Sequence, residues 1–451
     1  MFDLTLEMWG WVKENRKSGS WKDLFIYKMK IFISLILFIV QIIARNPDAV
    51  GRNGMVVSSH ELASQAGIEI LRQGGNAIDA SIATGFALSV VHPAAGNIGG
   101  GGFMVIRLSD GTVTTIDFRE VAPSGAYRDM FLDDSMNVIE NKSWNTAWAV
   151  GVPGSVAGFG MAHEKYGSAK WKTLVKTAAE LAKNGFPMDF QNIMAINHPY
   201  YQKFLSNDEE TEKIFSNKTP FTLYKKFYQK DLGNTLNRIA NIGWREFYTG
   251  KTADMIEKCM QRTNGLITKD DLKNYRSVER NPVTFYYRGY EVHSMPPASS
   301  GGVAIAGILN QLENINFDSL HYHSAQHIHY VSEAERRVYA DRAEFMGDMD
   351  YISVPIDQLI SDEYAQSRWN SVDSLKATPS ADIAHGNMAI SHPESEETTH
   401  YSVVDQWGNA VSVTTTINGW FGNGIVVDDA GFLLNNEMDD FSAKPGVPNA
   451  Y

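Results

Sequence analysis

The chain has 451 residues, of which 43% are hydrophobic and 20% charged, an ordinary globular composition long enough for one large domain or two to three smaller ones. Its net charge is −12, and no run of lysine and arginine offsets this acidity, so nucleic acid is excluded as an expected partner. The single cysteine, Cys259, excludes a disulfide framework or a CxxC metal site within one chain.

The N-terminal region consists of a polar extension, residues 1–28, and a hydrophobic segment. Lys28 and Lys30 precede Ile31–Ala44, which is almost entirely apolar but shorter than the roughly 20 residues of a membrane span. Basic residues before a short apolar core are typical of a signal peptide; an uncleaved anchor and a buried helix are the alternatives. We predict that residues 29–45 are a signal peptide or signal anchor. The rest of the chain is then periplasmic, secreted or membrane-anchored outside the cytoplasm.

The sequence that follows the hydrophobic segment predicts a short strand and two helices. Met55–Val57 is the strand, and Ser58 with Glu61 forms a possible capping box for a helix that extends to Gln73. Asn76 is the expected cap of a second helix, which is rich in alanine and apolar residues. This composition indicates a buried helical layer.

Four consecutive glycines, Gly99–Gly102, run directly into a predicted strand, Phe103–Leu108. They lack the G-K-[ST] of a phosphate-binding loop, and a strand follows where such a loop requires a helix. We therefore expect close approach of backbone segments, where side chains would not fit. A turn at Ser109–Gly111 leads to a second strand, Thr112–Phe118, completing a hairpin.

The middle of the chain is mainly helical. Residues 157–275 have amphipathic helical patterns, and Ser299–Gly302 leads into a helix whose N-terminal amides could face an anion. Ser332–Phe345 is predicted as a capped helix with many charge pairs. Residues 362–397 have little periodicity and are predicted as a polar linker.

A second hairpin is predicted beyond this linker. Tyr401–Val404 and Ala410–Thr416 alternate like strands, and a three-residue loop, Gln406–Gly408, is a common connection between them. If Asp405 pairs with Asn409, the numbers of paired residues sum to 814. The register of the whole hairpin follows from this one pair.

In this register Thr398 lies directly opposite Thr416. Because side chains alternate between the faces of a strand, the hairpin has one apolar and one hydroxyl-rich face. The apolar face carries Thr399, Tyr401, Val403, Val411, Val413 and Thr415, and the hydroxyl-rich face carries Thr398, His400, Ser402, Ala410, Ser412, Thr414 and Thr416.

A threonine at the head of a strand has one special chemical use. If the peptide bond before Thr398 is cut, this residue carries both a nucleophilic Oγ and a free α-amine with a pKa of roughly 7.7–8. The amine can then act as the base for its own hydroxyl, and Thr416 could orient that hydroxyl by a hydrogen bond. The alternative is that these threonines only reflect the preference of threonine for strands.

A group of histidines offers a further candidate site. His321, His323, His327 and His329 are close in sequence, but no cysteine or acidic residue joins them at a recognisable metal-binding spacing. A solvated or interface cluster is the favoured interpretation, with a metal site as the alternative.

Several separate stretches together resemble the γ-glutamyltranspeptidase family of the N-terminal-nucleophile hydrolases. In chain order they are GGNAIDASIATGFALSVVHPAAGNIGGGGF, DFREVAP, GVPGSVAGF, MPPASSGG, YADRAEFMGD, TTHYSVVD and LLNNEMDDFSAKPGVPN. The resemblance implies an α+β fold, an αββα sandwich. It also implies a division of the chain into a large-subunit part, residues 54–397, and the start of a small subunit, residues 398–451.

The resemblance also implies a reaction. The Oγ of Thr398 attacks the carbonyl of Glu397, and the precursor is cut between these residues into two subunits. The same Oγ then attacks the γ-glutamyl amide of glutathione or a related compound. The resulting ester passes its γ-glutamyl group to water or to an amino acid or dipeptide acceptor. No metal ion or organic cofactor is implied.

Four further residues are implied to bind the substrate. Arg119 resembles the family's clamp for the α-carboxylate, since a guanidinium binds a carboxylate with two hydrogen bonds. Glu437 and Asp440, with Asn418, are candidates for the α-ammonium, because acids three apart in a helical turn face the same way. Without the resemblance, Arg119 is equally compatible with an ion pair to Glu120 or another acid, and the acidic pair with a solvated turn.

The sequence departs from the family pattern after KPGVPN. The family has a Ser-Ser pair and a Gly-Gly pair downstream, and neither follows before Tyr451. We therefore expect a sandwich that is incomplete at its C-terminus. The alternative functions are a truncated inactive relative that acts as a non-catalytic binding module, and a related amide acylase.

Overall fold

The computed structural model describes residues 29–30, 49–216, 220–386, 398–444 and 446. The chain divides into two units, Met1–Gly51 and Arg52–Tyr451, and the fold described below is that of the second. The predicted polar extension, and the predicted signal segment apart from Met29 and Lys30, lie outside the described residues. Among the described residues, none of the helices combines the length and the apolar composition that a membrane-spanning segment needs.

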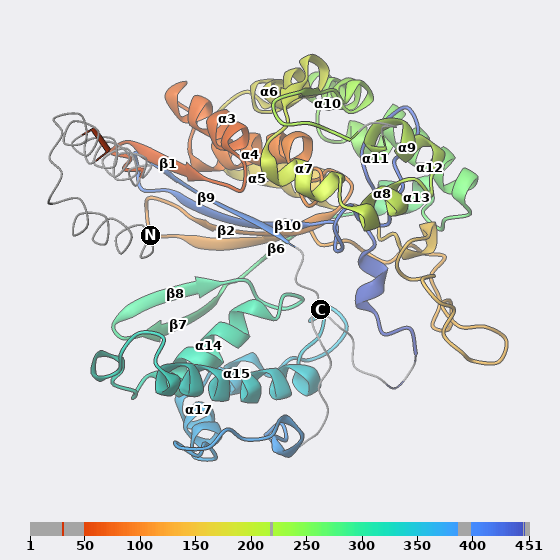
Figure 1. Ribbon diagram of the computed structural model, residues 1–451. Helices are drawn as coiled ribbons and strands as arrows, with labels where there is room; N and C mark the ends of the chain where they lie inside the picture. The colour runs from red at the N-terminus through yellow and green to blue at the C-terminus, as the bar shows by residue number, and fades with distance from the viewer. Residues whose placement is uncertain (1–28, 31–48, 217–219, 387–397, 445, 447–451) are drawn as a thin grey trace, which may run out of the picture. The chain divides into compact units, whose positions relative to one another are not determined.

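A six-stranded antiparallel sheet forms the centre of the fold, with the strand order β1-β9-β10-β2-β3-β6. Its strands are β1 (Gly54–Val57), β2 (Gly101–Arg107), β3 (Val113–Asp117), β6 (Val278–Arg280), β9 (Thr399–Asp405) and β10 (Ala410–Thr416). Figure 1 shows the two C-terminal strands, in blue, between strands from the N-terminal part of the chain. The hairpin that follows Thr398 is thus held on both sides by strands that are distant in sequence.

The β9–β10 hairpin has the predicted register. Ala410 pairs with Val404 and Thr415 with Thr399, so the numbers of paired residues sum to 814. The predicted faces are also confirmed, since one of them carries four buried apolar side chains, those of Tyr401, Val403, Val411 and Val413. On the other face the ring of His400 contacts the hydroxyl oxygens of Ser412 and Thr414, at 3.0 and 2.9 Å.

A helical layer covers the apolar face of the hairpin (Figure 1). The helix α4 (Ala77–Val91) contacts β9 and β10, and all of its residues are buried. Its predicted cap is confirmed, because Asn76 and Asp79 form a reciprocal capping box. The other helices of this body are α3 (Glu61–Arg72), α5 (Ser155–Tyr166), α6 (Trp171–Asn184), α7 (Phe190–Ile196), α8 (Pro199–Leu205), α9 (Glu209–Phe215), α10 (Lys230–Ile242), α11 (Glu246–Thr249), α12 (Lys251–Thr263) and α13 (Lys269–Asn274).

Shorter elements complete this body. They are the two-stranded sheet of β4 (Phe186–Pro187) and β5 (Lys226–Phe227), and the 3-10 helices η2 (Ala147–Ala149) and η5 (Glu437–Asp440). The capping box predicted for Ser58 and Glu61 is wrong, because His60 is the N-cap of α3 and its Nδ1 accepts a hydrogen bond from the Leu62 backbone. Ser58 instead donates to the carbonyl oxygen of His60.

A smaller lobe, residues 283–386, has its own hydrophobic core, made of Val283, Phe285, Val303, Ala306, Met346 and Leu359. Its elements are β7 (Val283–Tyr287), β8 (Tyr290–Ser294), α14 (Gly301–Leu312), η3 (Phe317–Ser319), α15 (Ala325–Phe345), α16 (Ile356–Leu359), α17 (Asp362–Trp369) and η4 (Ser380–Asp382). The helix predicted from Ser332 begins earlier, because Ser324 caps it. The predicted linker also begins with a helix, α17, which is capped by Ser361.

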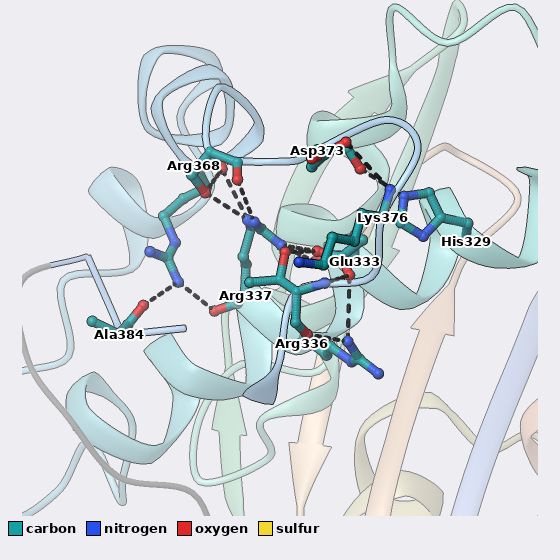
Figure 2. A network of polar contacts seen from close by, with 10 residues as sticks. His329, Glu333, Arg336, Arg337, Arg368, Asp373, Lys376 and Ala384 are labelled. Atoms are coloured by element: carbon teal, nitrogen blue, oxygen red, sulfur yellow. Dashed lines mark hydrogen bonds and ion pairs between the residues drawn. The ribbon is translucent and has the colours of Figure 1, made fainter. Parts of the chain in front are cut away.

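Buried charges attach the segment after α17 to the smaller lobe. Glu333 and Arg337, one turn apart on α15, form a buried ion pair with an N–O distance of 2.7 Å. Figure 2 shows the two side chains pointing toward one another. Arg337 also donates to the carbonyl oxygen of Arg368, whose own guanidinium donates to the carbonyl oxygens of Arg337 and Ala384. Polar side-chain contacts therefore hold this segment in place, and it has no periodic apolar face to bury. This explains why its sequence resembles a linker.

Asp405 connects the hairpin to the helical layer. Its carboxylate accepts hydrogen bonds from the Asn409 side chain, at 2.7 Å, and from the backbone N–H of Ala77, at 2.9 Å. Ala77 is the first residue of α4, where the helix dipole favours a negative charge.

Replacing Asp405 with alanine is expected to lower the free energy of unfolding by about 2–3 kcal/mol, because buried donors of Ala77 and Asn409 lose their acceptor. Urea denaturation measures this loss. Asp110→Ala is the matched control, since Asp110 lies in the exposed turn of the β2–β3 hairpin and accepts a hydrogen bond from the nearby Thr112 backbone. Equal losses in the two variants would contradict the connecting role of Asp405.

Candidate active site

Thr398 and Thr416 lie at the same end of the sheet. Thr398 is exposed and immediately precedes β9, whereas Thr416 is buried and ends β10. The ladder ends with the pair Thr399–Thr415, and the next pair in the same register is Thr398–Thr416. The register thus supports the predicted opposition of the two hydroxyl groups.

Close backbone packing explains the glycine run at this end of the sheet. A Cβ atom at Gly99 would lie 2.1 Å from the carbonyl oxygen of Leu433, and one at Gly100 would lie 2.1 Å from that of Thr416. Neither contact is compatible with a side chain. The predicted close approach is confirmed, and it brings the start of β2 against both Thr416 and the segment before Glu437.

The chain turns sharply after Thr416, and Asn418 stabilises the turn. Its backbone N–H donates to Thr416 Oγ1 at 2.8 Å, and its side-chain amide donates to the carbonyl oxygen of Asn436 at 3.1 Å. Asn436 returns a hydrogen bond from its backbone N–H to the carbonyl oxygen of Ile417. Asn418 therefore links the end of β10 to the segment that carries Glu437.

Asn435 is a buried residue that the sequence reasoning missed. Its side-chain amide donates to the carbonyl oxygens of Gly99 and Gly151, and its Oδ1 accepts from the backbone N–H groups of Gly151 and Glu437. The residue is part of the stretch NNEMDDF, but only the contacts distinguish it from its neighbours. It fixes the start of η5 against the glycine run.

Arg119 lies just after β3 and forms ion pairs with two acids. Its Nη1 contacts Glu437 and its Nη2 contacts Asp440, and both acids belong to η5. Residues three apart in a 3-10 helix face the same way, so both carboxylates meet one guanidinium. Three of the four predicted substrate-binding residues, Arg119, Glu437 and Asp440, are therefore brought together and paired with one another.

Glu120 adds a further acid that the sequence reasoning considered only as a partner of Arg119. Neither of its carboxylate oxygens has a hydrogen-bond partner among the described residues, and one lies close against Gly101. Burial, followed by the nearby charge of Glu437, raises the pKa of Glu120 well above its ordinary value. Burial likewise raises the pKa of Glu437 to about 7, although Arg119 opposes the shift.

A cleft of about 680 Å³ opens beside this cluster. One wall contains Arg119, Glu120, Glu437 and Asp440, and the facing wall comes from the smaller lobe and includes Arg342, residues 346–348 and residues 350–352. Thr398 and Thr416 are not among its lining residues. Arg119, whose side chain is 24% exposed, thus lines a cleft whose volume suffices for a small zwitterionic ligand.

The histidine cluster and the turn before α14, the other two candidates from the sequence, form no comparable site among the described residues. The ring of His327 packs edge-on against Phe317, and His329 contacts the carbonyl oxygen of Asp373 at 2.7 Å. Over the described residues, no group of three or more histidine, cysteine, aspartate or glutamate side chains is arranged to hold a metal ion. Ser300 precedes α14 as predicted, but its Oγ accepts a hydrogen bond from Arg342.

Comparison with known proteins agrees with this architecture. The family model described as Gamma-glutamyltranspeptidase matches residues 63–451. The glutathione hydrolase proenzyme of Escherichia coli is 48% identical over 402 residues, covering 89% of this chain and 69% of that protein. The crystal structure of Helicobacter pylori γ-glutamyltranspeptidase has a TM-score of 0.74 and 43% identity, covering 78% of this chain and 100% of that one.

A cephalosporin acylase from Bacillus halodurans shares the fold at a TM-score of 0.76 and 26% identity, covering 90% of this chain and 74% of that one. The match to the family model extends over most of the sequence and includes the hairpin, the glycine run and the Arg119 cluster. The chain therefore belongs to the γ-glutamyltranspeptidase family, the self-processing γ-glutamyl hydrolases and transferases that have the N-terminal-nucleophile hydrolase fold.

Proposed function

We propose that this chain cuts itself before Thr398 and then uses Thr398 to transfer γ-glutamyl groups from glutathione and related compounds. The main support for this proposal is the β9–β10 register, which ends at Thr399–Thr415 and would place Thr398 opposite Thr416, at the sheet end that also carries the Arg119 cluster. The large subunit would be residues 54–397 and the small subunit would begin at Thr398.

In the first reaction, Thr398 Oγ attacks the carbonyl carbon of Glu397. The C–N bond between these residues breaks as an ester forms, and the nitrogen becomes the α-amine of Thr398. Water then hydrolyses the ester, which frees the Glu397 carboxylate and restores the hydroxyl. Glu397 lies outside the described residues, so the geometry of this bond is part of the proposal.

In the second reaction, the new α-amine accepts the proton from Thr398 Oγ as this oxygen attacks the γ-carbonyl carbon of the substrate. Thr416 Oγ1 would keep the nucleophile oriented. The amine of the leaving group takes up the proton, and a γ-glutamyl ester remains on Thr398. Water, an amino acid or a dipeptide then accepts the γ-glutamyl group.

The substrate's γ-glutamyl end carries an α-carboxylate and an α-ammonium, and the cluster contains an opposite charge for each. The substrate carboxylate would replace one acid on the planar guanidinium of Arg119, which binds carboxylates with two parallel hydrogen bonds. Glu437, Asp440 and Asn418 would then face the ammonium. Because two acids share one arginine here, an added ammonium offsets their surplus negative charge.

We also propose that the chain is exported, and that residues 29–45 act as its signal peptide or membrane anchor. The basic residues before the apolar run Ile31–Ala44 support this localisation. An extracytoplasmic enzyme would meet glutathione outside the cytoplasm.

Thr416→Val is expected to reduce kcat on the order of 10²-fold, because misorientation of a nucleophile has an effect of this size. Turnover of a γ-glutamyl anilide measures it. Thr416→Ser keeps the hydroxyl and is expected to retain most of the activity. Full activity in the valine variant would show that Thr416 does not orient Thr398.

Arg119→Lys is expected to raise the KM for the γ-glutamyl anilide about 10- to 100-fold, since lysine keeps the charge but loses the paired hydrogen bonds. The control is Arg276→Lys, because Arg276 lines the same cleft but donates to the carbonyl oxygens of Lys273 and Tyr275. An unchanged KM in the Arg119 variant would favour a related amide acylase that does not recognise the γ-glutamyl group.

Substrate binding is expected to strengthen as pH rises through about 7, because Glu437 has a pKa of about 7 and attracts the ammonium only when ionised. The KM should fall over this range in the unsubstituted protein and stay flat in Glu437→Gln. The kcat should rise as the α-amine of Thr398 loses its proton, at roughly pH 7.7–8, and this rise should remain in both proteins. The same KM profile in both proteins would exclude Glu437 from binding the ammonium.

The pH dependence of the free energy of unfolding is expected to be opposite to that of substrate binding. Because the folded pKa of Glu437 lies above its ordinary value of 4.5, this carboxyl contributes stability that is present below pH 4.5 and lost as pH rises through about 7. Glu437→Gln should therefore flatten the stability profile over the same range.

A further inference from the structure

Thr399, the residue after the proposed nucleophile, is anchored in the core. The residue is only 4% exposed, and its Oγ1 lies 2.9 Å from Ser59 Oγ. Its ladder partner, Thr415, donates to the carbonyl oxygen of Gly101 and accepts from the Asn97 side chain. Hydroxyl and amide groups therefore lie beneath the sheet end where Thr398 is exposed.

Ser59 contacts β9 where the backbone of β1 no longer does. The β1–β9 ladder ends with Val57 opposite Ser402, so the first residues of β9 pair with β10 only. Ser59 lies in the short connection between β1 and α3, and its hydroxyl reaches Thr399 from the side that lacks a ladder. Strand ends paired on one side open more readily than strand interiors, so this contact restrains a weak point.

We infer that Ser59 is a positioning residue for Thr398. Adjacent residues in a strand point to opposite faces, so fixing Thr399 on the core face directs Thr398 to the face that carries Thr416. This inference rests on the proposed function, and it assigns to the β1–α3 connection a part in both self-cleavage and turnover. Ser59 acts through Thr399 and has no role in the chemistry itself.

Ser58 provides a matched control from the same connection. Its Oγ donates to the carbonyl oxygen of His60 and contacts Ser64 Oγ at 2.8 Å. These partners belong to α3 and its cap rather than to β9. Replacing Ser58 with alanine removes a hydroxyl from the same loop without removing the contact to Thr399.

The test compares Ser59→Ala, Ser59→Thr and Ser58→Ala in the full chain. Self-cleavage is followed by the appearance of an N-terminus at Thr398, and turnover is measured with a γ-glutamyl anilide. We expect Ser59→Ala to slow self-cleavage and to lower kcat by about 3- to 10-fold, the kinetic equivalent of one hydrogen bond, with KM unchanged. Ser59→Thr keeps the hydroxyl and should restore both rates, and Ser58→Ala should match the unsubstituted chain.

A double-substitution cycle separates positioning from general destabilisation. Thr399→Val removes the other half of the contact, so adding Ser59→Ala to it should cause no further loss. Equal effects of Ser59→Ala and Ser58→Ala, or additive effects of Ser59→Ala and Thr399→Val, would overturn the inference. Absence of self-cleavage in the unsubstituted chain would instead contradict the proposed function, so the two failures are distinguishable.

Discussion

Backbone hydrogen bonding between β9 and β10 is the constraint on which the candidate site depends. Because side chains alternate along a strand, a shift of one residue would move Thr398 to the core face and expose Tyr401 and Val403. The buried apolar face therefore stabilises the same register that opposes Thr398 and Thr416. The same contacts that form the core also set the direction of the proposed nucleophile.

Close backbone packing at this end of the sheet positions the other residues of the candidate site. Glycines at the start of β2 allow the backbone of Thr416 and Leu433 to approach, and Asn435 ties this region to η5. Arg119 follows β3 at the same end and meets the acids of η5. The cluster thus depends on small residues and buried amides as well as on its own charges.

Local patterns in the sequence predicted much of this arrangement, since the hairpin register, the cap at Asn76 and the pairing of acids three apart are set by neighbours in the chain. The order of the strands was not predictable from such patterns, because β9 and β10 enter between β1 and β2 by long-range pairing. Nor were the roles of Asn435 and Glu120, which follow from contacts with distant segments. The helix α17 was likewise not predicted, because ion pairs and hydrogen bonds with α15 stabilise its region and its sequence has little apolar periodicity.

In the proposed reaction, Thr398 becomes an N-terminal nucleophile that carries the γ-glutamyl group. Mass spectrometry of the protein, quenched during turnover of a γ-glutamyl substrate and then digested, tests this most directly. We expect a peptide that begins at Thr398 and carries one γ-glutamyl group on that residue. A label on another residue, or a Thr398 that is still joined to Glu397 in a protein that turns over substrate, would contradict it.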